Sequence, residues 1–134
     1  MSKKISFQGV EGAYSNLAVQ EFFPDAEPVP CKTFEIAIQK AESSSVDYAM
    51  IPIENSAAGR VADIHRLLPK SHLHINYEHF QKVEHKLLIH PDSELSSIKK
   101  VISHEQALAQ CSEKIQNLDL DILIGADTAG SAKM

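Results

Sequence analysis

Residues 50–61, MIPIENSAAGRV, hold the transition on which the interpretation of the whole chain depends. The apolar run at residues 50–53 is typical of the end of a buried strand. It leads directly into Glu54, Asn55 and Ser56, which carry a carboxylate, a carboxamide and a hydroxyl in a row, and a glycine follows shortly after. A plain turn would explain these polar residues, and so would a binding site at the end of a sheet.

Strand-like and helix-like segments alternate on both sides of this stretch. The alternation predicts an α/β fold with mostly parallel sheets, in two small lobes. Two longer strands are expected between His72 and His90, where the chain is expected to cross from one lobe to the other. The other expected strands cover residues 5–8, 28–32, 48–53, 101–102 and 120–124. The expected helices cover residues 14–22, 34–41, 61–68 and about 105–116, with a last helix after Asp127.

Composition and charge exclude several classes of partner. The chain has 134 residues, is 43% hydrophobic and carries a formal charge of −5, with arginine only at positions 60 and 66. Nothing resembles a basic nucleic-acid surface or a polybasic membrane patch. No apolar run approaches the roughly 18 residues of a membrane span, and the first residues lack a secretory signal. Cys31 and Cys111 form no CxxC pair, which indicates reduced thiols in a cytoplasmic protein.

Polar and small residues follow four of the predicted strands. In open α/β sheets, ligands bind outside the carboxyl ends of the strands. Each of these loops also precedes a helix, whose first N–H groups attract anions. An acidic protein could therefore hold an anionic ligand here, although N-capping alone would explain any single loop. The four loops cover residues 9–15, 54–56, 103–106 and 125–128.

The helix after Ser103 is predicted to have a glutamine stripe. At 100° per residue, Ser103, Gln106 and Gln110 fall within about 60° of each other. The stripe could be a solvated flank or could line a polar cleft. The adjoining arc is apolar and is expected to face the core, so that Cys111 is a core residue and not a nucleophile. This arc comprises Ala107, Leu108, Cys111 and Ile115.

Together these stretches resemble the prephenate dehydratase family. The motifs occur in the family's order and spacing and cover essentially the whole chain, although Glu105 stands where the family usually has proline. The resemblance implies a two-lobed, type 2 periplasmic-binding-protein-like fold, with lobe 1 at about residues 1–75 and part of lobe 2 at about 76–134. The motifs are Gly9-x-x-Gly-Ala-Tyr-Ser15, Ile51-Pro-Ile-Glu-Asn-Ser56, Ser103-His-Glu-Gln-Ala-Leu-Ala-Gln-Cys111 and Asp127-Thr-Ala129.

The resemblance also implies a reaction, the conversion of prephenate into phenylpyruvate, water and CO2 in phenylalanine biosynthesis. It implies a cytoplasmic dimer or tetramer that needs no cofactor. The seven histidines match no strong zinc pattern, so no metal site is expected. Two alternatives stay open, namely arogenate dehydratase and a non-catalytic fragment that binds an anion or regulates another protein.

The resemblance places neutral hydrogen-bond donors in the cleft between the lobes. Neutral donors suit this chemistry because they assist the departing hydroxide without neutralising the carboxylate that must leave. A positioned donor typically accelerates such a reaction 10²–10⁴-fold. Asn55, Ser103 and Gln110 are predicted to be catalytic. The predicted substrate-binding residues are Tyr14, Ser15, Asn55, Ser56, Ser103, Gln106, Gln110 and Thr128.

One family motif has no counterpart in the chain. Thr-Arg-Phe, whose threonine is held to be central to catalysis, does not occur in the sequence. The family's catalytic domain is expected to continue for roughly another 45 to 50 residues, and a regulatory ACT domain is absent. The second lobe is therefore expected to be incomplete, and the 134-residue chain to have little dehydratase activity alone.

Overall fold

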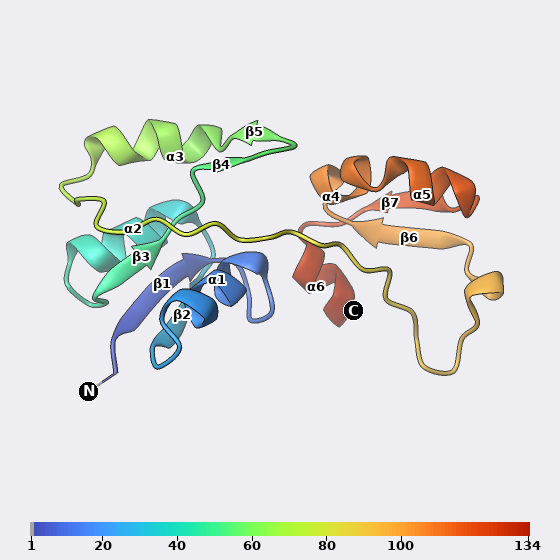
Figure 1. Cartoon of the computed structure of the whole chain (residues 1–134), viewed down its shortest axis with the longest axis horizontal. Helices are drawn as coiled ribbons and strands as arrows, with labels where there is room; N and C mark the ends of the chain where they lie inside the picture. The colour runs from blue at the N-terminus through green and yellow to red at the C-terminus, as the bar shows by residue number, and fades with distance from the viewer. Residues whose placement is uncertain (1) are drawn as a thin grey trace. The chain divides into compact units, whose positions relative to one another are not determined.

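The computed structural model describes residues 2–134 and divides the chain into two compact units. Unit 1 comprises residues 1–82 and unit 2 comprises residues 83–134. The division follows Lys82, whereas the sequence-based boundary lay near residue 75. Met1, which that prediction included in the first lobe, lies outside the described residues. Figure 1 shows the elements of each unit.

Unit 1 is built on a three-stranded parallel sheet. Strand β1 (Lys4–Gln8) lies between β2 (Glu27–Cys31) and β3 (Tyr48–Met50). The connections from β1 to β2 and from β2 to β3 are the helices α1 (Tyr14–Phe22) and α2 (Phe34–Glu42), and both pack on the sheet (Figure 1). The predicted order of strands and helices is confirmed in this part of the chain.

The core of unit 1 lies on the central strand. Ile5, Phe7 and Val19 are essentially inaccessible to solvent and pack together. Between them in the sequence, Ser6 is also fully buried, and its hydroxyl donates a hydrogen bond to the Ala37 carbonyl at 2.7 Å. The bond supplies the partner that a buried hydroxyl needs, and it ties α2 to β1.

Two predicted helix caps are confirmed. The Thr33 hydroxyl accepts a hydrogen bond from the Ile36 N–H at 3.1 Å, at the start of α2. In unit 2, the Asp127 carboxylate accepts from the Gly130 N–H and so begins α6 (Thr128–Lys133). Each side-chain oxygen satisfies one of the N–H groups that the first turn of a helix leaves without a partner.

The third strand is shorter than predicted. It ends at Met50, where the sequence indicated Ile53, because Pro52 has no N–H with which to continue the ladder. The sequence reasoning also missed the hairpin that follows. Its two short antiparallel strands are β4 (Glu54–Asn55) and β5 (Gly59–Arg60).

The next helix ends slightly earlier than its apolar pattern predicted. Helix α3 spans Ala62–Leu67 and buries Ile64 completely. A 3₁₀ turn, η1 (Leu68–Lys70), contains Pro69 and finishes the helical segment. Pro69 therefore stops the α-helical hydrogen bonding, as predicted, and it does so from inside the turn that follows.

The two strands predicted between His72 and His90 are wrong, because residues 71–90 contain no strand. A strand needs a partner backbone, and none of the strands in residues 2–134 pairs with this segment. Side chains hold its first part to unit 1 instead. The Tyr77 ring lies 5.5, 5.8 and 5.7 Å, between centroids, from the rings of Phe22, Phe23 and Tyr48.

Unit 2 resumes the βα order. Strand β6 (Lys100–Ser103) pairs in parallel with β7 (Asp121–Ile124). A 3₁₀ turn, η2 (Leu95–Ser97), precedes β6, and α4 (Glu105–Gln110) and α5 (Ser112–Asn117) connect the two strands. Helix α6 follows β7 and contacts β6. The sheets of both units are therefore parallel, and only the β4–β5 hairpin is antiparallel within residues 2–134.

The single helix predicted over about 105–116 is wrong, because it breaks at Cys111 into α4 and α5. The Cys111 N–H is shared between the carbonyls of Ala107 and Leu108, at 3.2 and 3.1 Å. Such sharing tightens a helix end and interrupts the regular ladder. The apolar arc is confirmed, since Ala107, Leu108 and Ile115 are buried, although Cys111 is only half-buried.

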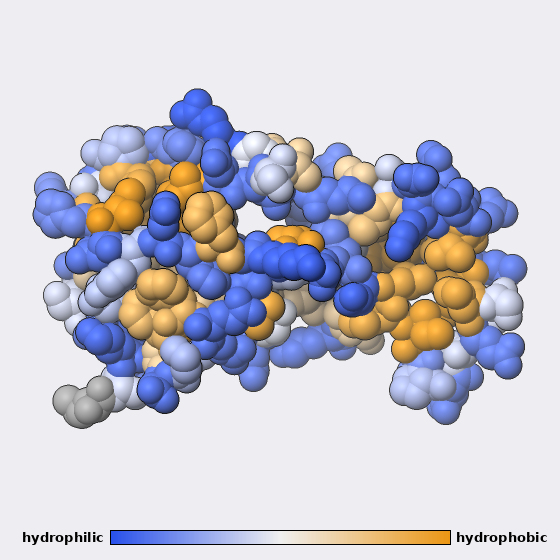
Figure 2. Space-filling model, in the orientation of Figure 1, coloured by the Kyte–Doolittle hydropathy of each residue, from blue (hydrophilic) through white to orange (hydrophobic). Residues whose placement is uncertain are grey.

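Strand β7 is apolar and exposed. Ile122, Leu123 and Ile124 are 49%, 45% and 65% accessible to solvent. Since successive side chains point to opposite faces, both faces of β7 are uncovered within residues 2–134. Figure 2 shows hydrophobic residues gathered on the visible surface of this unit.

Candidate functional site

The eight predicted site residues lie in both units, four in each. Unit 1 holds Tyr14, Ser15, Asn55 and Ser56. Unit 2 holds Ser103, Gln106, Gln110 and Thr128. Tyr14, Ser15, Ser103, Gln106, Gln110 and Thr128 lie at the end of a parallel strand or in a helix that follows one, whereas Asn55 and Ser56 lie in the antiparallel β4–β5 hairpin.

The first turn lies between β1 and α1. Gly9 and Gly12 have φ values of +125° and +92°, which glycine adopts without strain. Ala13 occupies the N-cap position of α1 and offers no side-chain cap. Tyr14 and Ser15, both half-buried, are the first two residues of this helix.

Asn16 is a site candidate that the sequence reasoning missed. Its side chain is only 3% exposed, and its Oδ1 accepts a hydrogen bond from the Gly12 N–H at 3.0 Å. Its Nδ2 is buried and has no hydrogen-bond partner among residues 2–134. A buried donor of this kind costs about 1–3 kcal/mol unless a water molecule or a ligand satisfies it. In the sequence Asn16 is only a helical residue that follows Tyr14 and Ser15, and nothing there predicts that its side chain is buried.

Asn55 stabilises its own hairpin turn. Its Oδ1 accepts from the backbone N–H of Ala57 at 2.8 Å and of Ala58 at 3.2 Å. The turn closes at Gly59, whose φ of +79° lies in the left-handed region. Because the carboxamide oxygen serves the turn, the NH₂ group is the part of Asn55 that can bind a ligand. Ser56 lies in the same turn and is exposed.

Across the hairpin, Glu54 pairs in register with Arg60, so a carboxylate and a guanidinium occupy opposite positions. The Arg60 guanidinium also lies 3.4 Å from the imidazole Nδ1 of His65, on α3. These charged and titratable side chains lie next to Asn55 in the hairpin and on the helix that follows it.

In unit 2, Ser103 ends β6 and its carbonyl accepts from the Gly125 N–H at 2.7 Å. The N-cap of α4 is His104, whose Nδ1 accepts from the Gln106 N–H at 3.2 Å. A Cβ at position 125 would collide with the Ser131 hydroxyl, so only glycine allows this approach of β7 to α6.

Gln110 has a partner that the sequence did not predict. The side-chain Oε1 of Gln110 lies 2.9 Å from the imidazole Nε2 of His85, and both residues belong to unit 2. The two lie 25 residues apart, so sequence spacing gave no sign of the contact. Gln106 is exposed on the same helix, and Thr128 is half-buried directly after the Asp127 cap.

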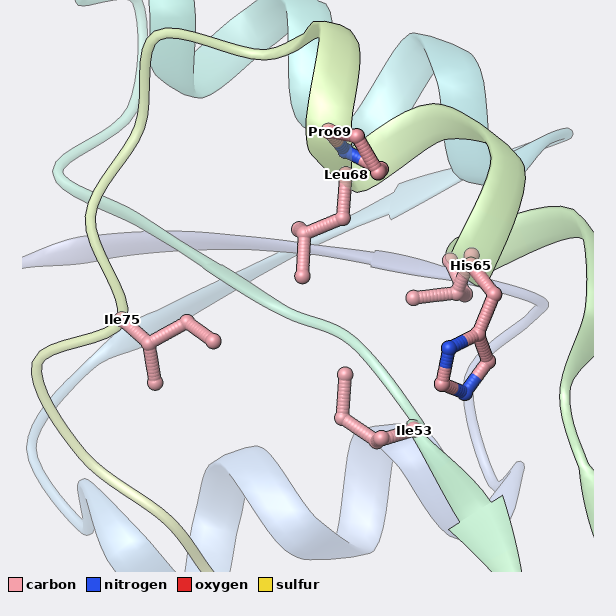
Figure 3. A pocket seen from close by; sticks show the side chains of 6 residues that line it. Ile53, His65, Leu68, Pro69 and Ile75 are labelled. Atoms are coloured by element: carbon pink, nitrogen blue, oxygen red, sulfur yellow. The ribbon is translucent and has the colours of Figure 1, made fainter.

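Unit 1 also contains an apolar cavity of about 410 Å³. Figure 3 shows the side chains of Ile53, Leu68 and Ile75 directed into one hollow, with the His65 ring at its edge. The size lies within the roughly 300–1,000 Å³ of small-molecule sites. The lining residues are Ile53, Ile64, His65, Leu68, Pro69 and Ile75.

Neither cysteine forms a disulfide. Burial raises the pKa of the Cys31 thiol, and this effect exceeds the opposing effects of the Lys40 charge and of a hydrogen bond from the Phe7 backbone. A buried thiol with a raised pKa is a poor nucleophile. In residues 2–134, no group of three or more His, Cys, Asp or Glu side chains is arranged to hold a metal ion.

A family model described as prephenate dehydratase matches residues 5–134, which include both groups of site residues. The chain belongs to the prephenate dehydratase family. Members of this family are lyases, and the chain has the type 2 periplasmic-binding-like fold of the family's solved structures. No helix in residues 2–134 is long and apolar enough to cross a membrane.

Two curated relatives and one solved structure illustrate the relationship. The chain is 45% identical over 130 residues to a bifunctional N-acyl-homoserine lactone acylase/prephenate dehydratase of Komagataeibacter europaeus, covering 97% of this chain and 46% of the relative. It is 44% identical to arogenate dehydratase/prephenate dehydratase 1, chloroplastic, of Arabidopsis thaliana, covering 97% of this chain and 33% of the relative. It thus spans less than half of either relative.

The solved structure is prephenate dehydratase from Arthrobacter aurescens in complex with L-Phe. It superposes with a TM-score of 0.75 at 25% identity, and the match covers 97% of this chain and 44% of that one. The match extends over both units of the chain described here.

Proposed function

We propose that the protein takes part in the decarboxylative dehydration of prephenate to phenylpyruvate, and that the eight site residues bind the substrate. The observation that carries the proposal is the family match over residues 5–134, since this range contains all eight. Its substrate is a small dicarboxylate.

Neutral donors are suited to this reaction. When the ring carboxylate leaves as CO2, its bonding electrons enter the ring, the C–O bond to the ring hydroxyl breaks, and a proton on the departing oxygen yields water. Asn55, Ser103 and Gln110 contribute amide and hydroxyl donors, which stabilise the developing negative charge. A lysine in their place would bind the leaving carboxylate more tightly and so oppose its loss.

Asn55 supports the proposal by its geometry. Its oxygen is engaged by the Ala57 and Ala58 N–H groups, so the NH₂ group is the end that can meet a carboxylate. Asn16 adds a buried NH₂ group that lacks a partner.

The proposal includes a cytoplasmic homo-oligomer, a dimer or a tetramer. Two free thiols are consistent with a reducing compartment. The mass of the purified natural chain by light scattering, together with cell fractionation, tests both parts. A chain that is monomeric at all working concentrations would contradict the oligomer.

The decisive experiment is a turnover assay of the full natural protein on prephenate and on arogenate, following phenylpyruvate and phenylalanine. Faster turnover of prephenate supports the proposal. A preference for arogenate would instead support arogenate dehydratase activity, which the names of several relatives include, among them that of the Arabidopsis protein. Binding of prephenate without turnover of either compound would leave a non-catalytic anion-binding role.

A second candidate function is hydrolysis of N-acyl-homoserine lactones, the other activity in the name of the Komagataeibacter protein. The apolar cavity of unit 1 favours it, because a cavity lined by Ile53, Leu68 and Ile75 is suited to an acyl chain. The test is to incubate the full protein with these lactones and to detect the freed amine.

The matched variant is Ile75→Asp. Ile75 is 73% exposed, so a carboxylate there is tolerated by the fold but disfavours an acyl chain. Loss of lactone hydrolysis with unchanged prephenate turnover would support the second function. Absence of hydrolysis in the natural protein would reject it without affecting the dehydratase proposal.

A further inference from the structure

We infer that His85 is a positioning residue for Gln110, which fixes the end of the Gln110 carboxamide that an anionic substrate meets. The inference rests on the proposed role of Gln110 in substrate binding. Its basis is the distance of 2.9 Å between Nε2 of His85 and Oε1 of Gln110. His85 lies within residues 71–90, which contain no strand, and it belongs to unit 2.

A glutamine side chain has two ends of similar size and opposite character. The NH₂ end donates hydrogen bonds and the oxygen end accepts them. Gln110 is the last residue of α4 and is exposed, so nothing in the helix itself prefers one orientation. Only the NH₂ end attracts a carboxylate, because the oxygen end repels it. An anion therefore binds to only one of the two orientations of the amide, the one that presents the NH₂ group.

A hydrogen bond to Oε1 makes that choice before the substrate arrives. With its oxygen held by His85, Gln110 directs its NH₂ group away from the imidazole. A net hydrogen bond of ordinary strength favours one orientation by roughly 3- to 10-fold. Without the bond about half of the side chains are correctly oriented and with it roughly 75–90% are, so orientation alone raises the apparent affinity by about 1.5- to 2-fold.

The contact also specifies where the imidazole carries a proton. Oε1 can only accept, so Nε2 of His85 must carry the hydrogen. The Nε2-protonated neutral ring and the imidazolium both meet this condition. The neutral ring protonated on Nδ1 does not, since it would instead accept a hydrogen bond from a rotated Gln110.

Asn55 shows the same arrangement by different means. Its carboxamide oxygen accepts two backbone N–H groups, from Ala57 and Ala58, and this too leaves the NH₂ end for a ligand. Two of the three residues proposed as catalytic thus have their oxygens engaged within their own unit. In unit 1 the turn supplies the hydrogens, and in unit 2 His85 does.

Three substitutions in the full natural protein test the inference. His85→Gln places an NH₂ group at the same distance along the side chain as Nε2, so it should keep the bond. His85→Asn is shorter, and His85→Ala has no donor. We expect KM for prephenate to rise about 1.5- to 2-fold in H85N and H85A, with kcat changed less, and H85Q to remain close to the natural protein. His90→Ala is the control, since exposed His90 is bonded to nearby Asp92.

A double-mutant cycle separates this role from a purely structural one. If His85 acts through Gln110, H85A should add nothing to the defect of Gln110→Ala. An equal loss in both backgrounds, or a failure of H85Q to restore KM while the melting temperature is normal, would overturn the inference. If Q110A leaves KM unchanged, the proposed role of Gln110 fails instead.

A spectroscopic measurement tests the geometry independently of activity. Long-range ¹H–¹⁵N correlation spectra of the full natural protein report which ring nitrogen of His85 is protonated. A proton on Nε2 is expected, together with a change in the Gln110 side-chain amide signals in H85A. A ring protonated on Nδ1 alone would contradict the inference whatever the assays show.

Discussion

The Oδ1 atom of Asn55 accepts the backbone N–H of Ala57 at 2.8 Å, so this side chain stabilises the fold with one end while its other end can bind a ligand. Asn55→Asp separates these two roles, because the carboxylate keeps the acceptor and removes the NH₂ donor. We expect Asp to preserve the melting temperature of the full protein and to lower kcat/KM by more than about 100-fold.

Asn55→Ala is the matched variant, since it removes both the oxygen acceptor and the NH₂ donor of the side chain. It should add a stability loss of about 0.5–1.5 kcal/mol for the lost turn hydrogen bonds. Thermal unfolding and steady-state kinetics measure the two effects. Full activity in the Asp variant would show that the NH₂ group does not touch the substrate.

The second prediction concerns salt. The groups proposed to bind the substrate, such as the amides of Asn55 and Gln110, are neutral donors without positive charge. Binding of phenylpyruvate should therefore weaken only slightly between low and high ionic strength, in contrast with a site built from lysines. Titrations at two salt concentrations measure it. A steep dependence would point to a charged surface such as Lys99-Lys100 as the true site.

The third prediction concerns Cys31. Burial raises the pKa of its thiol, so the folded chain retains this proton at a pH where the unfolded chain has lost it. The contribution of the Cys31 thiol to the free energy of unfolding is therefore fully present below the ordinary thiol pKa. It is lost as the pH rises from that value through the raised pKa of the folded chain. Iodoacetamide should label Cys31 slowly in the native chain and quickly in urea. The half-buried Cys111 should react first, and the reverse order would contradict this assignment.

The fourth prediction concerns the exposed faces of β7. Ile122, Leu123 and Ile124 expose apolar surface on a strand with an open edge, and such an edge pairs readily with another chain. The 134-residue chain made alone should self-associate and should turn over prephenate negligibly. Ile122→Lys together with Ile124→Lys should reduce the association. A monomeric 134-residue chain as active as a longer form would refute the prediction.

Most of the fold of unit 1 follows from local sequence patterns. Apolar spacing located α1 and α2, and Thr33 marked the start of α2, because side-chain burial and capping are properties of neighbouring residues. Strands at residues 71–90 were predicted wrongly because an alternating pattern gives a preference for extended backbone but cannot supply a partner strand. The break at Cys111 depends on shared hydrogen bonds that no periodicity reports.

The candidate site was only partly accessible from the sequence. The positions of Asn55, Ser103 and Gln110 followed from the motifs and from the strand ends beside them. His85 and Asn16 did not, because their importance depends on contacts made after folding: an imidazole 25 residues from its amide, and a buried NH₂ group without a partner. The sequence identified the donors, and the structure adds the groups that orient them.

The attachment of residues 71–82 through the Tyr77 ring cluster has a consequence for how this protein can change over evolution. A strand in a sheet is fixed in register along its whole length, so inserting one residue would turn every later side chain to the opposite face. The contacts of residues 71–82 come instead from separate groups: the Tyr77 ring cluster, the His72 N–H bonded to Glu42, and His79 beside Glu21. Insertions and deletions after His79 would therefore leave the core of unit 1 undisturbed, and chain length should vary here more freely than within β1 or α2.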